Sequence, residues 1–175
     1  MDLNTVLNPI WIILPAYIAN GTPVVVAKIL SLLGLSRHSI DFGRRLFDGK
    51  RVFGDNKSWE GFFAGLLTGI LTGYIQYTLA GDEIYLYRGA TLSFGALVGD
   101  LIGAFIKRRL GIEPGKPLPI LDQLLFIITA IAIAQLLDYL KLSILERIYV
   151  LIVTLALHVV TNRIAYLLKL KDVPW

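Results

Sequence analysis

The segment Trp59–Ala80, with the sequence WEGFFAGLLTGILTGYIQYTLA, decides the fold class of this chain. After Glu60 it carries no charged residue for 20 positions. A helix needs about 20 mostly apolar residues to cross the roughly 30 Å hydrocarbon core of a bilayer. The segment therefore predicts a membrane-spanning α-helix.

Four other segments are similarly apolar, which predicts an all-α integral membrane protein with about five spans. They cover residues 6–35, 90–106, 121–140 and 148–168. Composition agrees, because 17% of the 175 residues are charged against about 25% in soluble domains. The first span contains Pro9, Pro15, Gly21 and Pro23. We expect these residues to break its helix, and we expect residues 1–175 to form a single domain.

Lys and Arg residues are distributed unevenly between the two ends of these spans. Twelve lie in residues 36–58, 107–120 and the tail after 168, whereas three lie on the other side. Cytoplasmic connections of membrane proteins are enriched in Lys and Arg. We therefore predict an outside N-terminus, a cytoplasmic C-terminus and a polar cavity that faces the cytoplasm. The first residues, MDLN, lack a basic region, so we expect no cleaved signal peptide.

Glycines recur at every fourth position in two of the predicted spans. They are Gly61, Gly65, Gly69 and Gly73 in one, and Gly95, Gly99 and Gly103 in the other. Small residues at this spacing let helix backbones approach closely in lipid. We interpret the glycines as helix-packing positions rather than as room for a ligand.

Acidic residues at the cytoplasmic ends of the spans point to chemistry. Asp100 lies inside a predicted span, where an ionised carboxylate is costly without a wet cavity or a partner. Lys107, seven residues later, shares its helix face. Asp122 opens the next span, where it is either an N-cap or a partner that faces Asp100. Two carboxylates among cations, in a chain without cysteine, fit Mg²⁺ bridging to a polyphosphate.

Several motifs resemble the CDP-diglyceride synthase superfamily. Residues 53–61, FGDNKSWEG, resemble its Lys-Ser/Thr-Trp-Glu-Gly motif. Its spaced signature is matched by Gly99-Asp100, Lys107-Arg108, Gly111-Ile112 and Leu121-Asp122-Gln123. Its archaeal branch, the CDP-archaeol synthases, is resembled by PAYIAN at 15–20, IDFGR at 40–44, HVVTN at 158–162 and KDVPW at 171–175. The matches extend over nearly the whole chain.

The resemblance implies a CTP-dependent cytidylyltransferase of membrane lipid biosynthesis. Such an enzyme uses Mg²⁺ to transfer CMP from CTP to the phosphate of an unsaturated archaeal ether lipid, 2,3-di-O-geranylgeranylglycerol 1-phosphate. The products are CDP-archaeol and pyrophosphate. A CTP-dependent polyprenol kinase and a small ion-coupled transporter remain open as alternatives. Nucleic acid is not an expected partner, because no aromatic platform accompanies the basic loops, and the sequence leaves the oligomeric state open.

The resemblance and the charge pattern together assign roles to particular residues. Asp100 and Asp122 are the predicted metal ligands. Lys107 and Arg108 join them as catalytic residues that bind phosphate oxygens. The predicted substrate contacts are Lys57, Ser58, Asn56, Asp55, Glu60, Arg44, Arg109 and Asn20. Ser58 and Glu60 also fit a simple helix start, and Glu60 also fits a residue that orients a neighbouring base.

Two positions depart from the family pattern. Relatives commonly carry Ser where Ala104 stands and a second Asp where Leu125 stands. On a helix Leu125 lies one turn after Asp122 and on nearly the same face, but a leucine cannot bind a metal or a phosphate. Whatever completes the site must then come from other groups.

Overall fold

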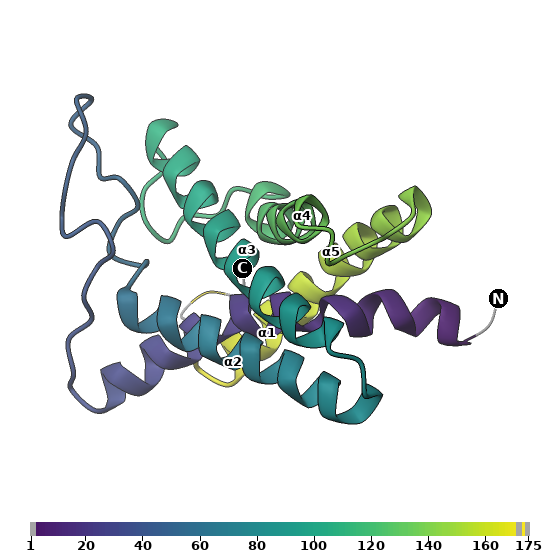
Figure 1. Ribbon diagram of the computed structural model, residues 1–175. Coiled ribbons are helices and arrows are strands. Elements are labelled where there is room, and N and C mark those ends of the chain that lie inside the picture. Colours follow the sequence, from purple (N-terminus) through teal and green to yellow (C-terminus); the bar gives the residue numbers. More distant parts are fainter. Residues whose placement is uncertain (1–2, 171–172, 174–175) are drawn as a thin grey trace.

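The computed structural model of the protein describes residues 3–170 and 173, and its regular structure is helical (Figure 1). The helices are α1 (Leu3–Leu32), α2 (Trp59–Ala80), α3 (Ile84–Arg109), α4 (Leu121–Leu136) and α5 (Ile144–Leu167). Two isolated β-bridges, Ser39 with Ser58 and Arg45 with Arg51, occur in the connection before α2. The all-α prediction is confirmed. The motif at 171–175 lies outside the described residues except for Val173.

Four of the helices in the described part of the chain are long and apolar enough to cross a membrane: α1, α2, α3 and α5. Helix α4 has 16 residues, and at 1.5 Å per residue it is about 24 Å long. That length is short of a roughly 30 Å hydrocarbon core. The predicted fourth span, 121–140, extends four residues beyond the end of α4 at Leu136. The helix ends there because Asp138 adopts a left-handed backbone conformation with φ 57°. Helix α3 instead begins six residues before its predicted start.

The predicted break in the first span is wrong, because α1 is one continuous helix with three prolines inside it. A proline has no N–H, so the carbonyl four residues earlier loses its helical hydrogen bond. Pro15 therefore leaves the carbonyl of Trp11 without its helical hydrogen bond. The side-chain Nε2 of Gln76, on α2, donates to that carbonyl. A neighbouring helix therefore supplies the hydrogen bond that the proline removes.

The glycines lie where helix backbones meet. A Cβ on Gly65 would lie 2.6 Å from the carbonyl oxygen of Ala19, in α1. A Cβ on Gly73 would lie 2.5 Å from the Cα of Gly89, in α3, and a Cβ on Gly95 would lie 2.6 Å from the Cα of Ala130, in α4. No side chain fits at such distances. The prediction that these glycines serve helix packing is confirmed.

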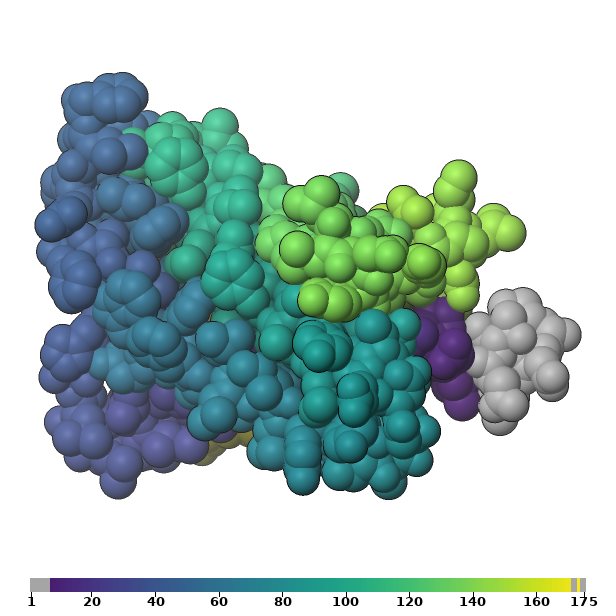
Figure 2. Space-filling view, in the orientation of Figure 1, coloured from purple at the N-terminus to yellow at the C-terminus, as the bar shows by residue number. Residues whose placement is uncertain are grey.

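The connections 33–58 and 110–120 lie at the same end of the helices. Figure 1 shows the connection 33–58 beside the C-terminal end of α3. In Figure 2 this connection and the end of α3 form one continuous surface. The connection 33–58 is largely exposed and polar. Most of the predicted site residues lie in these connections and at the adjoining helix ends.

Candidate active site

The connection before α2 is ordered around the buried carboxylate of Asp41. Its oxygens accept hydrogen bonds from the guanidinium of Arg51 and from the backbone N–H groups of Gly43, Phe53 and Gly54. Burial raises the pKa of Asp41, but these hydrogen bonds outweigh it and hold the pKa well below its usual range. Sequence analysis did not include Asp41 among the site residues. The available signal was an acidic residue within a basic loop.

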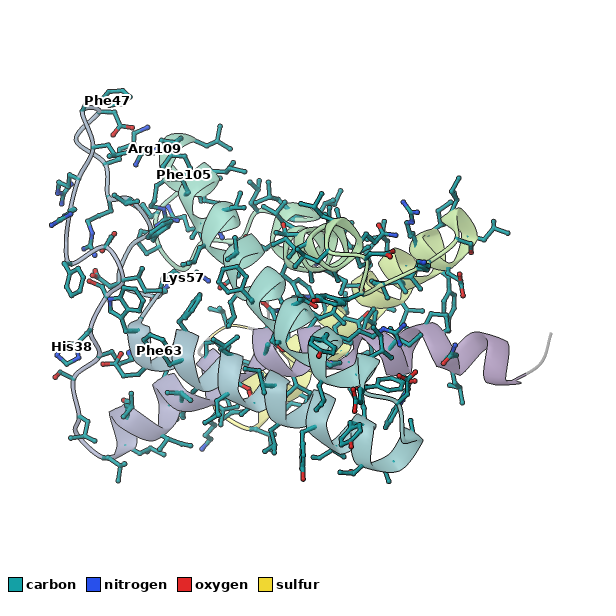
Figure 3. The ribbon with its side chains drawn as sticks, viewed as in Figure 1. His38, Phe47, Lys57, Phe63, Phe105 and Arg109 are labelled. Carbon is teal, nitrogen blue, oxygen red and sulfur yellow. The ribbon has the colours of Figure 1, made fainter. Side chains whose placement is uncertain are left out.

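Arg109 and Lys50 attach this loop to the end of α3. Nη1 of Arg109 lies 2.6 Å from Oδ1 of Asp48, and its Nη2 donates to the carbonyl of Arg51. The guanidinium also lies over the ring of Phe105, 5.2 Å from its centre, as labelled in Figure 3. From the loop side, Nζ of Lys50 donates to the carbonyl of Arg109 at 3.1 Å. The hydrogen bonds of Arg109, a predicted substrate contact, thus go to the loop.

A small cleft, open to solvent, lies between this loop and helices α1, α2 and α3. Its lining comprises Pro23, Ile40, Asn56, Lys57, Ser58, Phe62, Leu97, Asp100 and Leu101. Nζ of Lys57 contacts both carboxylate oxygens of Asp100, at 2.6 and 2.5 Å. Ser58 is the N-cap of α2, where its Oγ accepts from the N–H of Gly61. The structure therefore brings four predicted site residues, Asn56, Lys57, Ser58 and Asp100, into one cleft.

A second acid–base pair joins α3 to α4. Nζ of Lys107 lies 2.7 Å from Oδ2 of Asp122, and the N–H of Leu118 donates to the same oxygen at 2.7 Å. Asp122 lies in the first turn of α4, whose N-cap position is Ile120, so the N-cap alternative is wrong. Each of the two predicted magnesium ligands is thus paired with its own lysine.

Arg108, at the end of α3, is the most unusual charged residue of the site. Only 6% of its surface is exposed, and within the described part of the chain neither Nε nor Nη1 has a hydrogen-bond partner. The two connections cover it, because a Cβ on Gly54 would lie 3.4 Å from Nη1 of Arg108 and 3.2 Å from Cγ of Pro114. The carboxylates of Asp122 and Glu113 attract this charge at longer range, but neither gives Nε or Nη1 a hydrogen-bond partner. Buried donors without a partner are costly, so the position is suited to bind an anionic ligand.

The remaining predicted contacts do not line the cleft. Asp55 is exposed and pairs with Arg51 at 2.8 Å. Glu60 accepts hydrogen bonds from the backbone N–H of His38 and contacts its Nδ1 at 2.6 Å, so the neighbouring base that it orients is His38. Arg44 is exposed on the loop. Asn20 lies in α1, one turn before Pro23 of the cleft.

The donor atoms fit a magnesium ion that arrives with a nucleotide. Among the described residues, no three His, Cys, Asp or Glu side chains cluster to form a complete metal site. Magnesium is commonly bound through one or two protein carboxylates and completes its shell with waters and phosphate oxygens. Asp100 and Asp122 supply oxygen ligands of that kind and number.

These features define a class of protein: an integral membrane protein with a cluster of acidic and basic side chains at one end of its helices. The family model for CDP-archaeol synthases (CarS-like) matches residues 2–175. The chain is 42% identical to the CDP-archaeol synthase of Pyrococcus abyssi, over 99% of this chain and 100% of that protein. It is 44% identical to that of Pyrobaculum islandicum, over the full length of both.

A solved structure gives the same result. It is described as an intramembrane enzyme for archaeal membrane lipids biosynthesis, and it aligns with a TM-score of 0.81 at 38% identity. The alignment covers 90% of this chain and 94% of that one. The chain belongs to the CDP-archaeol synthase family, whose members are CTP-dependent cytidylyltransferases.

Proposed function

We propose that this enzyme transfers CMP from CTP to the phosphate of 2,3-di-O-geranylgeranylglycerol 1-phosphate, giving CDP-archaeol and pyrophosphate. The observation that carries the proposal is Arg108, a buried residue whose Nε and Nη1 have no hydrogen-bond partner among the described residues. It lies beside the Lys107–Asp122 pair and under the loop that carries Lys57. Both substrates offer the phosphate oxygens that such a cation binds.

The reaction joins two phosphate groups. An oxygen of the lipid phosphate forms a bond to the α-phosphorus of CTP, and the bond from that phosphorus to the bridging oxygen breaks, so pyrophosphate leaves. The second pKa of a phosphate monoester is about 6, so at neutral pH the nucleophile is already largely deprotonated. The protein needs no general base. Its work is to place the two groups in line and to neutralise their charge.

The two Lys–Asp pairs are suited to exchange partners when substrates bind. Phosphate oxygens compete with Asp100 for the ammonium group of Lys57, and with Asp122 for that of Lys107. Each exchange leaves a carboxylate available for magnesium, which neutralises phosphate charge when bound. Nε and Nη1 of Arg108 need no such exchange, because neither has a hydrogen-bond partner among the described residues. Arg109 holds the loop to α3, and Glu60 holds His38 of the loop to the start of α2.

The cytoplasm is the side that we propose for the active site. The site residues lie beside connections 33–58 and 110–120. Residues 36–58 and 107–120 together carry 10 of the 17 Lys and Arg residues of the chain. Cytoplasmic connections have this bias. CTP would then approach from solution, and the lipid phosphate from the bilayer surface.

The released product tests the proposal. Purified enzyme in liposomes is given magnesium, the lipid phosphate and CTP labelled at either the α- or the γ-phosphorus. Cytidylyl transfer places the α-label in the lipid and the γ-label in pyrophosphate. A polyprenol kinase would place the γ-label in the lipid and release CDP, and a transporter would do neither. Either of these outcomes would refute the proposal.

Arg108 offers a second, independent test. Arg108→Met removes a buried, unpaired charge while keeping an apolar stem, so we expect the melting temperature to rise by several degrees. Turnover should fall at least about 100-fold, because phosphate neutralisation is lost. Arg163→Met, at an exposed position of α5, is the matched control and should change turnover little. A stabilised variant with normal turnover would remove Arg108 from the site.

A further inference from the structure

Four aromatic side chains gather where the loop enters α2. We call Phe42, Trp59, Phe62 and Phe63 the aromatic cluster. The rings of Trp59 and Phe63 stack with centroids 5.6 Å apart, and Phe62 meets both edge-on at 6.2 and 5.8 Å. Phe42 lies 6.4 Å from Trp59. Phe42 and Phe63 are nonetheless 67% and 58% exposed, so the cluster presents a large apolar surface outward.

The aromatic cluster is continuous with the cleft. Phe62 belongs to both, because its side chain lines the cleft together with Lys57 and Asp100. Helix α2 begins at Trp59, directly after the cleft residues Lys57 and Ser58. Figure 3 shows Phe63 and Lys57 at the same end of this helix. An apolar path thus leads from the outer surface of a membrane helix to the charged groups of the site.

We propose, on the basis of the function proposed above, that the aromatic cluster binds the isoprene units nearest the headgroup of the lipid phosphate. The lipid then enters the cleft sideways from the bilayer. Charge complementarity selects this occupant, because Lys57 at the inner end of the path attracts the phosphate. The branched chain of the same molecule needs an apolar surface directly beside that phosphate. Aromatic rings provide such a surface with large contact area.

The indole of Trp59 also brings a hydrogen-bond donor to the aromatic cluster. Its Nε1 is buried and has no hydrogen-bond partner within the described residues. Buried donors almost always have a partner. The glycerol ether and phosphate oxygens of the lipid accept hydrogen bonds, so either can serve this N–H. The cluster therefore matches both the chain and the headgroup region of the substrate.

Kinetics with two lipid phosphates form the first test. We expect Phe63→Ala to raise KM about 5- to 10-fold for a geranylgeranyl ether-lipid phosphate, with KM for CTP unchanged. KM for a short-chain dialkylglycerol phosphate should also stay unchanged, because that lipid lacks the isoprene units. Leu67→Ala is the matched control, since Leu67 lies one turn later on α2 and is 68% exposed. Equal effects of the two variants would show membrane anchoring only, and a raised KM for CTP would show base stacking; either overturns the proposal.

A binding measurement that needs no turnover forms the second test. Trp11→Phe with Trp175→Phe leaves Trp59 as the only tryptophan, and its fluorescence reports nearby bromine. A dialkylglycerol phosphate brominated close to the headgroup should quench Trp59 more strongly than an equally brominated neutral lipid at the same mole fraction. Equal quenching would refute the site. Selective quenching without pyrophosphate release by the unmodified enzyme would instead refute the proposed reaction and leave the lipid site standing.

Discussion

Asp41→Asn tests whether one buried carboxylate orders the loop of the active site. Oδ2 of Asp41 accepts from Nε of Arg51 at 3.1 Å and from the N–H groups of Phe53 and Gly54 at 2.9 Å each. Oδ1 accepts from the N–H of Gly43 and from Nη2 of Arg51. In asparagine one of these oxygens becomes an NH₂ group. Whichever way the amide turns, at least two donors then face another donor.

The expected cost follows from that count. A buried hydrogen-bonding group left without a partner costs about 1–3 kcal/mol, so two of them make loop opening at least about 2 kcal/mol easier. At about 1.4 kcal/mol for each factor of ten, amide exchange of Phe53 and Gly54 should accelerate at least about 30-fold. The control is Asp55→Asn. Asp55 pairs with the same Arg51, but its side chain is 74% exposed, and exposed pairs contribute about 0–1 kcal/mol.

Hydrogen exchange measured by mass spectrometry on the peptide that contains residues 53–54 decides the question. An Asp41→Asn protein that exchanges no faster than Asp55→Asn would refute the reasoning. The pH dependence has a definite sign, because the folded-state pKa of Asp41 lies below the value of about 3.9 for an unperturbed Asp. Its stabilising contribution is therefore complete above about pH 4 and decreases only as the pH falls further. Between pH 5 and 8, loop opening should not change through Asp41.

Three further predictions concern the metal, the departure from the family pattern and the topology. Asp100→Asn should lower turnover by orders of magnitude while circular dichroism stays helical; full CTP-dependent turnover would contradict its role as a ligand. Leu125 lies against α3, with its Cδ2 3.6 Å from where a Cβ on Gly103 would stand, so Leu125→Asp should raise magnesium affinity or turnover in a magnesium titration. No gain in either would place position 125 outside the site. A cysteine near Asp48 should be labelled from the cytoplasm and one near Asp82 from outside, and labelling of both from one face would contradict the orientation.

Hydropathy and spacing in the sequence were sufficient for the membrane class, the helices and the role of the glycines. These properties depend on the local chain and on a solvent that is nearly uniform for every helix. The same reasoning failed in α1, where a proline indicates a broken helix. The break does not occur, because Gln76, 65 positions later than Trp11, donates to the carbonyl that Pro15 leaves free. Hydropathy also placed the end of the fourth span too late, since the turn at Asp138 interrupts an otherwise apolar run.

Motif spacing also predicted the charged residues of the site, but their partners came only from the tertiary structure. The sequence suggested that Asp100 and Asp122 face each other, whereas the structure pairs Asp100 with Lys57 and Asp122 with Lys107. It gave no sign that Arg108 is buried or that Asp41 orders the loop. Pairing and burial depend on how helices cross and on which loop lies over which helix end. Those contacts join residues as far as 61 positions apart, and helical periodicity carries no information about them.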